Sequence, residues 1–286
     1  MKVIDETEKD MFDLVRSDFN VSTSEECTRD IILNWLHLKA RSIPMRPRTV
    51  VYSKTIKPKL CQFPEIREID ERFKKGADLT MYLGTAYHKK PKMYDADILF
   101  NDWHIHHLHL GRLWKKPKLK SRTKDLLFVH VQPDDVTCLD IRPHGAWADQ
   151  DLVRILFRER PDIAEKYDLK GAMPGKVSTD NEVKGRRNAG LSSIISVDER
   201  VYTSPGYGIS TSRHSTSIVY FYIHLFNTIR ATISALDNDH IPPNIMNYIY
   251  SDLSSPLRIG LKYFMGHFIV FEKNRDIPLS YTRCLS

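Results

Sequence analysis

The hydrophobic positions of the first 76 residues recur mostly at the three- and four-residue spacing of amphipathic helices. Residues 5–40 predict two such helices, and the second begins after a Ser- and Glu-rich stretch that is suited to capping. Residues 64–76 predict another helix, with Gly76 near its C-terminal end. We therefore expect residues 1–76 to form a mainly helical region.

From residue 77 the pattern changes to short apolar runs. The stretches WHIHHLHLG (103–111), DLLFVHV (125–131) and VTCLDI (136–141) predict strands, and a QPDD turn joins the last two into a hairpin. A helix is predicted to begin at Asp149. We assign residues 77–172 to a central α+β domain that contains an antiparallel sheet.

The remaining residues, 173–286, predict a third domain, also α+β. Two short strands flank a tight turn at Asp198, a long apolar helix covers 217–236, and two strands follow within 257–273. The predicted fold class is therefore α+β, with N-terminal helices, a central antiparallel sheet and a C-terminal α/β part.

Composition narrows the class of protein. The 286 residues are 41% hydrophobic and 28% charged, which is typical of a globular chain and not of a disordered one. Forty-three Lys and Arg against thirty-six Asp and Glu give a net charge of +7, a mild preference for anionic partners such as nucleic acid. The acidic N-terminus, the lack of long apolar runs and four scattered cysteines predict a cytoplasmic protein without membrane segments, disulfides or a zinc ribbon.

Histidines are concentrated in the predicted central sheet, where six of the twelve fall between residues 104 and 144. In a strand, alternate side chains share a face, so His104 and His106 are expected on one side and His107 and His109 on the other. All four therefore cannot converge on one centre. The six are His104, His106, His107, His109, His130 and His144.

Three interpretations of these histidines remain open. In the first, His107 and His109 exchange protons with a phosphodiester, and His130 or His144 assists. Arg142 stabilises the phosphate, and no cofactor is needed. In the second, the histidines bind a divalent metal such as zinc, with His104 and His106 as ligands. In the third, they only pack, since a buried histidine needs partners for its ring nitrogens.

The order of WHIHHLHLG and DLLFVHVQPDDVTCLDIRPHG resembles the core of RelE/HigB-type toxins, which are bacterial ribonucleases. The resemblance covers about one sixth of the chain. It implies metal-independent RNA cleavage by His and Arg side chains, a neutralising antitoxin partner and a mobile-element or phage-defence setting. It places His109, His130, Arg142 and His144 in plausible positions. The chain departs from the family in its greater length and in the insert that follows the first strand.

That insert, RLWKKPKLKSRTK (112–124), is basic and contains no acidic residue. A cationic loop with an aromatic side chain beside a predicted active strand is suited to contact a nucleic-acid backbone. A solvated hairpin arm is the alternative. The predicted nucleic-acid-binding residues are Arg112, Trp114, Lys115, Lys116, Lys118, Lys120 and Arg122.

A Gly- and Ser-rich loop, PGYGISTSRHSTS (205–217), precedes the long apolar helix. Helix N-termini bind anions through free N–H groups, which makes this loop a second phosphate-binding candidate. An ordinary Ser or Thr cap is the alternative. The predicted phosphate ligands are Ser210, Thr211, Ser212, Arg213 and His214.

We therefore expect a nucleic-acid-directed hydrolase, most simply a toxin-like endoribonuclease that uses histidine acid–base catalysis. One alternative is a metal-dependent nuclease or phosphodiesterase that uses the same histidines. The other is a non-catalytic protein that binds nucleic acid, with RNA foremost, or a protein partner.

Overall fold

The computed structural model describes most of the chain in two compact units. The terminal unit joins the two ends of the chain, Met1–Ala40 and Ile218–Leu285, and the central unit is Arg41–Ser217. No helix among the described residues is long and apolar enough to cross a membrane. The described residues are 2–19, 29–84, 98–111, 124–146, 149–175, 178–189, 191, 194–212, 214–238 and 255–283.

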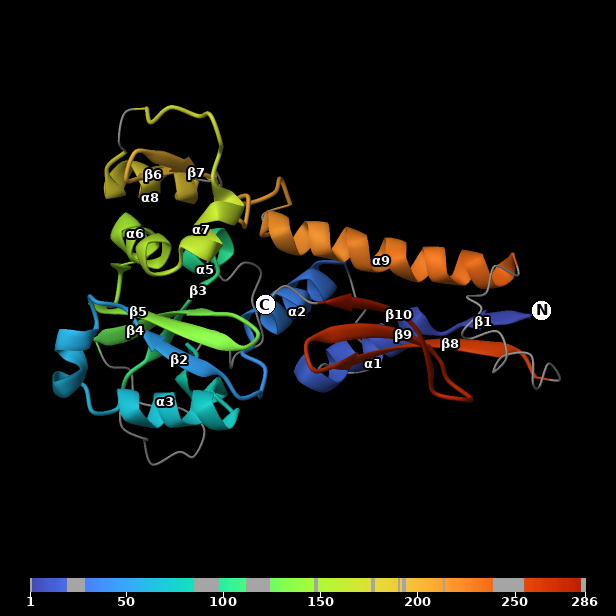
Figure 1. Cartoon of the computed structure of the whole chain (residues 1–286). Coiled ribbons are helices and arrows are strands. Elements are labelled where there is room, and N and C mark those ends of the chain that lie inside the picture. Colours follow the sequence, from blue (N-terminus) through green and yellow to red (C-terminus); the bar gives the residue numbers. More distant parts are fainter. Residues whose placement is uncertain are drawn as a thin grey trace. The chain divides into compact units, whose positions relative to one another are not determined.

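The terminal unit is built on a four-stranded sheet in the order β1-β8-β9-β10. Strand β1 is parallel to β8, whereas β9 is antiparallel to both β8 and β10. Helices α1, α2 and α9 lie beside this sheet in the same unit (Figure 1). The elements are β1 (Val3–Asp5), α1 (Thr7–Phe19), α2 (Arg29–Arg41), α9 (Thr216–Asp237), β8 (Leu257–Phe264), β9 (His267–Glu272) and β10 (Ile277–Arg283).

Contacts between distant segments hold this unit together. The ring of Phe268 on β9 packs against Trp35 of α2 at 5.5 Å and Phe221 of α9 at 5.8 Å, measured between ring centroids. Hydrogen bonds from Lys273 and Arg258 lower the pKa of Glu6 to about 2. Aromatic packing therefore joins α2 and α9 to β9, and ion pairs join the chain start to the C-terminal strands.

The central unit contains a second four-stranded sheet, in the order β2-β5-β4-β3, with helices on both faces (Figure 1). A two-stranded sheet of β6 and β7 completes it. The elements are β2 (Thr49–Tyr52), α3 (Ile66–Lys75), α5 (Ile98–Trp103), β3 (Ile105–His109), β4 (Asp125–Val131), β5 (Asp135–Pro143), α6 (Gln150–Glu159), α7 (Pro161–Tyr167), α8 (Asp180–Asn188), β6 (Ile195–Val197) and β7 (Arg200–Tyr202), with 3-10 helices η1 (Lys57–Gln62) and η2 (Thr80–Tyr82).

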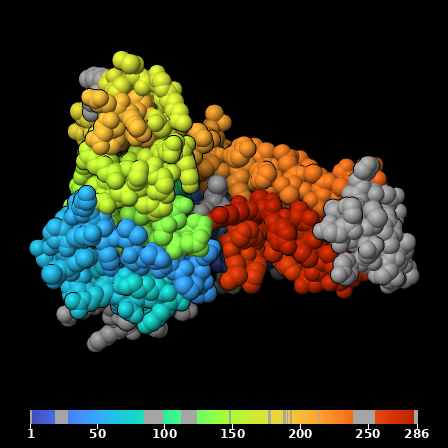
Figure 2. Space-filling view, in the orientation of Figure 1, coloured from blue at the N-terminus to red at the C-terminus, as the bar shows by residue number. Residues whose placement is uncertain are grey.

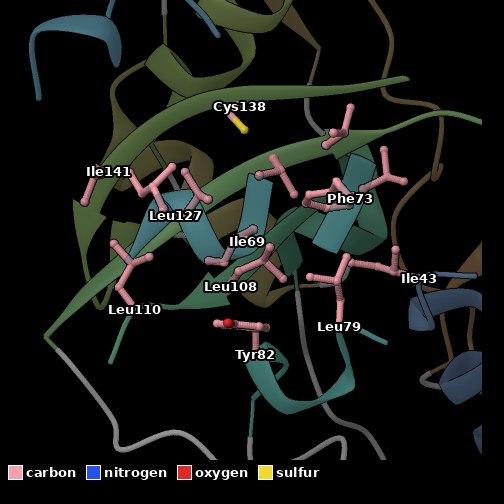
Figure 3. Packing of buried hydrophobic residues seen from close by; sticks show 14 of the residues in the cluster. Ile43, Ile69, Phe73, Leu79, Tyr82, Leu108, Leu110, Leu127, Cys138 and Ile141 are labelled. Carbon is pink, nitrogen blue, oxygen red and sulfur yellow. The ribbon is translucent and has the colours of Figure 1, made fainter. Parts of the chain in front are cut away.

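Strand alternation gives the central sheet two apolar cores. On one face, Leu108 of β3 and Leu127 of β4 belong to the same buried cluster as Ile69 and Phe73 of α3 (Figure 3). On the other face, residues one position along, such as Phe128 of β4, are buried with α5, α6 and α7. Both faces are covered, which explains why β4 is apolar along nearly its whole length.

The predicted α+β class is confirmed, with three differences in detail. The central sheet is mixed and not purely antiparallel, because β2 runs parallel to β5. The helix expected from Asp149 is divided into α6 and α7 at Arg160, just before Pro161, whose ring cannot continue a helix. The two units also differ from the predicted division into three consecutive domains. Strand β1 at the chain start pairs with β8 near the C-terminus, and β2 pairs with β5.

Candidate active site

The pairing of β3, β4 and β5 places His107, His109 and Arg142 on one face of the central sheet. His109 is paired with Leu126, and Leu126 with Arg142. The neighbouring row contains His107, Phe128 and Asp140. Directly paired residues point to the same face, so these side chains share the α6 side of the sheet.

His107, His109 and His144 form what we call the three-histidine group. The ring centroids of His107 and His109 are 5.7 Å apart, and those of His109 and His144 are 6.5 Å apart. A Cβ built on Gly84 would lie 3.5 Å from Nε2 of His109 and 3.7 Å from Nε2 of His107. Two imidazole nitrogens therefore flank one position, which the missing side chain of Gly84 leaves open.

Exposure differs across the group. His109 is buried, His107 is half-buried and His144 is exposed, so the group extends from the protein interior to solvent. The backbone N–H of His144 donates to the carbonyl of Lys124 at 2.7 Å, which fixes His144 beside the start of β4. A substrate atom can therefore approach the buried histidines from the side of His144.

Arg142 lies among carboxylates. Its Nε donates to Asp140 at 2.5 Å, its Nη1 to Asp149 at 2.8 Å and its Nη2 to Asp151 at 2.6 Å. Lys59 donates to the other oxygen of Asp140 at 2.6 Å. Partial burial works against the charged form of Arg142, but the hydrogen bonds to Asp151 and Asp140 prevail and raise its pKa.

This ion network changes the expected role of Arg142. The two cations, Arg142 and Lys59, face three carboxylates, so the cluster has no excess positive charge. A phosphate would have to displace a carboxylate to gain a bidentate contact with the guanidinium. The arrangement joins β5 to the start of α6 instead.

His130 and His104 lie apart from the three-histidine group. His130 occupies the next row of the sheet, paired with Ile105 and Thr137. Burial, followed by the charges of His104 and Arg160, lowers the pKa of His130 to about 3, and burial lowers that of His104 to about 4. Both rings are neutral at pH 7 and are therefore poor proton donors.

His104 and His106, the predicted metal ligands, both contact one aromatic ring. The Phe100 ring lies 5.8 Å from that of His104 and 4.7 Å from that of His106. His104 precedes β3 with a positive φ of 53°, outside the strand in which it was expected to share a face with His106. Among the described residues, no group of three or more His, Cys, Asp or Glu side chains is placed to hold a metal ion.

Residues 112–123 of the basic insert lie outside the described residues, whereas Gly111 and Lys124, on either side of them, are described. Gly111 follows His109 by two positions, and the carbonyl of Lys124 accepts the hydrogen bond from His144. The chain thus enters the insert two positions after His109 and leaves it at Lys124, which is hydrogen-bonded to His144. The residues outside the description include Arg112, Trp114, Lys115, Lys116, Lys118, Lys120 and Arg122.

The Gly- and Ser-rich loop is a tight turn. The Ser210 hydroxyl donates to the carbonyl of His214 at 3.0 Å and lies 2.8 Å from the Ser212 hydroxyl, while a bridge pairs Ile209 with Ser215. The hydroxyls of Ser210 and Ser212 therefore bind within the loop, next to Thr211, which is exposed. Arg213 lies outside the described residues.

Several residues of the site gave no signal in the sequence. Gly84 and Lys59 come from segments more than twenty residues before β3. Asp149 and Asp151 stand at the start of α6, where acidic residues are common caps. Only the fold brings these residues to the histidines and to Arg142.

Comparison of the chain with protein-family models, with curated proteins and with solved structures finds no match.

Proposed function

We propose that the protein cleaves RNA by acid–base catalysis at the three-histidine group. His107 and His109 transfer the protons, and His144 assists from the solvent side. The convergence of the His107 and His109 Nε2 atoms beside Gly84 is the observation that carries this proposal. Phosphodiester cleavage needs one group to take a proton from the attacking oxygen and another to protonate the leaving oxygen.

The distances suit this chemistry. The rings of His107 and His109 are in contact, with centroids 5.7 Å apart, and their Nε2 atoms lie 3.7 Å and 3.5 Å from one position at Gly84, so both nitrogens can serve one reacting group that approaches from their shared side. Imidazole is also the side chain best suited to both accept and donate a proton near neutral pH.

Binding of the nucleic acid is assigned to the basic insert. Six cations lie within residues 112–123, and of the two residues that flank this segment, Gly111 follows His109 by two positions and Lys124 is hydrogen-bonded to His144. Backbone phosphates would bind there, since Arg142 is committed to carboxylates. The proposed substrate is cytoplasmic RNA. A neutralising antitoxin is proposed as a protein partner on the basis of the resemblance to ribonuclease toxins alone.

The test is cleavage of a labelled RNA by the full-length protein with and without EDTA. The double variant His107→Gln/His109→Gln should cleave about 10²- to 10⁴-fold more slowly, because it lacks both proton-transfer groups. The matched control is His106→Gln, on the same strand but next to Phe100, and it should keep near-normal activity. Circular dichroism should show that all variants are folded.

Three results would contradict the proposal. If the wild-type protein does not cleave the RNA, the proposed activity is wrong. An equal loss in His106→Gln indicates damage to β3 and not the loss of two catalytic imidazoles. Cleavage that EDTA abolishes and a divalent metal restores reassigns the histidines to metal ligation.

A further inference from the structure

The central unit contains a cavity of about 450 Å³ in which none of the three histidines takes part. Its walls come from the β6–β7 hairpin, the segment 169–175, the start of α6 and α8. Figure 1 shows β6, β7 and α8 grouped beside α6, and Figure 2 shows this yellow to light-orange region at the surface. The volume falls in the range of about 300–1,000 Å³ that is typical of small-molecule sites.

The β6–β7 hairpin has two different faces. Ile195, Val197 and Tyr202 are buried in the core shared with α6 and α7. Ser196 is paired with Val201, and both point to the opposite side, where they line the cavity. Strand alternation therefore gives the cavity one wall that bears both a hydroxyl and an apolar side chain.

The segment 169–175 adds an apolar wall that is hydrogen-bonded to the same hairpin. The N–H of Leu169 donates to the carbonyl of Val201 at 2.8 Å, and the N–H of Ala172 donates to Leu169 at 2.9 Å. Met173 is 87% exposed and Ile194 is 56% exposed, and both line the cavity. Large apolar side chains at such a position gain free energy when an apolar ligand covers them.

Helix α8 brings a cation to the cavity. It begins with a capping box in which the N–H of Glu182 donates to the Thr179 hydroxyl at 3.2 Å and the N–H of Thr179 donates to the Glu182 carboxylate at 2.7 Å. Val183 is 1% exposed and anchors the helix. Arg186 is three positions further along, on the same side of the helix, and lines the cavity.

Arg186 differs from three other arginines of the central unit in having no paired carboxylate among the described residues. Arg142, Arg158 and Arg160 each pair with carboxylates. A half-buried guanidinium that has no counter-ion among the described residues, in a cavity with hydroxyl groups, attracts an anion.

We propose that this cavity binds a small organic anion with an apolar body. The carboxylate or phosphate group of the ligand pairs with Arg186 and accepts hydrogen bonds from the hydroxyls of Ser178 and Ser196. The apolar body packs against Val201 and Ile194. Both anionic groups match the planar guanidinium, so the shared chemistry is an oxyanion joined to an apolar group.

The experiment is calorimetric titration of the full-length protein with phenyl phosphate and with benzoate. At least one of them should bind with one-to-one stoichiometry, and the stronger identifies the preferred oxyanion. Inorganic phosphate, which lacks the apolar body, and benzyl alcohol, which lacks the charge, should each bind at least about tenfold more weakly.

Variants locate the binding site. Arg186→Met keeps the apolar stem but loses the charge, and should weaken binding at least about tenfold. Arg186→Lys should restore part of it. Lys184→Met is the matched control, because Lys184 is exposed on the same helix and does not line the cavity, and its binding should be unchanged.

The proposal is overturned if neither phenyl phosphate nor benzoate binds saturably in the low millimolar range. It is also overturned if folded Arg186→Met binds as well as the wild type, or if inorganic phosphate binds as tightly as phenyl phosphate. An equal loss in Lys184→Met would indicate a general charge effect and would equally contradict the assigned site.

Discussion

Nη1 of Arg142 donates to the Asp149 carboxylate at 2.8 Å, and the other oxygen of Asp149 accepts the N–H of Asp151 at 3.0 Å. One carboxylate thus caps α6 and holds the guanidinium that extends from β5. Asp149 therefore joins the end of β5 to the start of α6, the helix that covers the histidine face of the central sheet.

Replacing Asp149 should loosen α6. Asp149→Ala removes the cap and one partner of Arg142, and should lower the free energy of unfolding by about 1–3 kcal/mol. Asp149→Asn keeps a capping oxygen and should cost less. Hydrogen exchange of α6 amides measures this within the central unit. Equal protection in Asp149→Ala and wild type would show that the cap and ion pair contribute little.

Gly84→Ala should impair cleavage without unfolding the protein. The added Cβ would sit at ordinary contact distance, 3.5 Å and 3.7 Å, from the two histidine Nε2 atoms, and would occupy the space beside them. We expect kcat/KM to fall at least about tenfold, because small displacements of reacting groups are costly. Gly185→Ala, where a Cβ meets nothing within 4 Å, is the control for the substitution itself. Full activity of Gly84→Ala would argue against a reacting group at this position.

The low pKa of His130 predicts acid sensitivity. Its pKa is about 3 in the folded protein, against about 6.5 in an unfolded chain. Between these values the unfolded chain binds the extra proton, so the free energy of unfolding falls as pH falls from 6.5, by up to about 1.4 kcal/mol per pH unit. Urea unfolding from pH 7 to pH 4.5 should show a shallower dependence for His130→Leu. Identical slopes for the variant and the wild type would contradict the assignment.

The basic insert predicts a salt-dependent affinity for single-stranded RNA. Each phosphate contact contributes about −0.7 to the slope of log affinity against log salt concentration. Changing Lys115, Lys116, Lys118 and Lys120 to Ser should therefore make this slope less negative by up to about three. Fluorescence anisotropy at several salt concentrations measures the slope. Exposed lysines elsewhere, such as Lys9 and Lys75, provide a control double variant. An unchanged slope in the insert variant would show that the insert does not contact RNA.

Gly76 is required for the junction after α3. It has a φ of 65°, and an added Cβ would lie 2.5 Å from the backbone carbon of Arg46. Gly76→Ala should therefore destabilise the central unit by more than about 1 kcal/mol. Gly185→Ala, inside α8, should instead stabilise it by about 0.5–1 kcal/mol, because alanine is the better helix former. Thermal or urea unfolding of the two variants should give shifts of opposite sign, and shifts of the same sign would contradict this explanation.

The sequence by itself determined features that depend on near neighbours along the chain. Apolar periodicity predicted α1, α2, α3 and α9, the β4–β5 and β6–β7 hairpins, and the α+β class. Strand alternation separated His106 from His107 and His109. The turn at Asp198 and the cap at Gly76 were also predicted, because positive φ angles at these sites follow from local chain geometry.

Only the tertiary structure decided how distant segments combine. Local periodicity does not specify that β1 pairs with β8 or that β2 runs parallel to β5. The short β1 and the outer strand β10 have weak patterns of their own, and pairing with neighbours defines them. The ion pairs of Arg142 with Asp149 and Asp151 form where the chain turns from β5 into α6. Gly84 beside two histidines, and Arg186 in its cavity without a paired carboxylate among the described residues, arise from packing between residues far apart in sequence. Their physical cause is the burial of both sheet faces, which no single segment of the chain encodes.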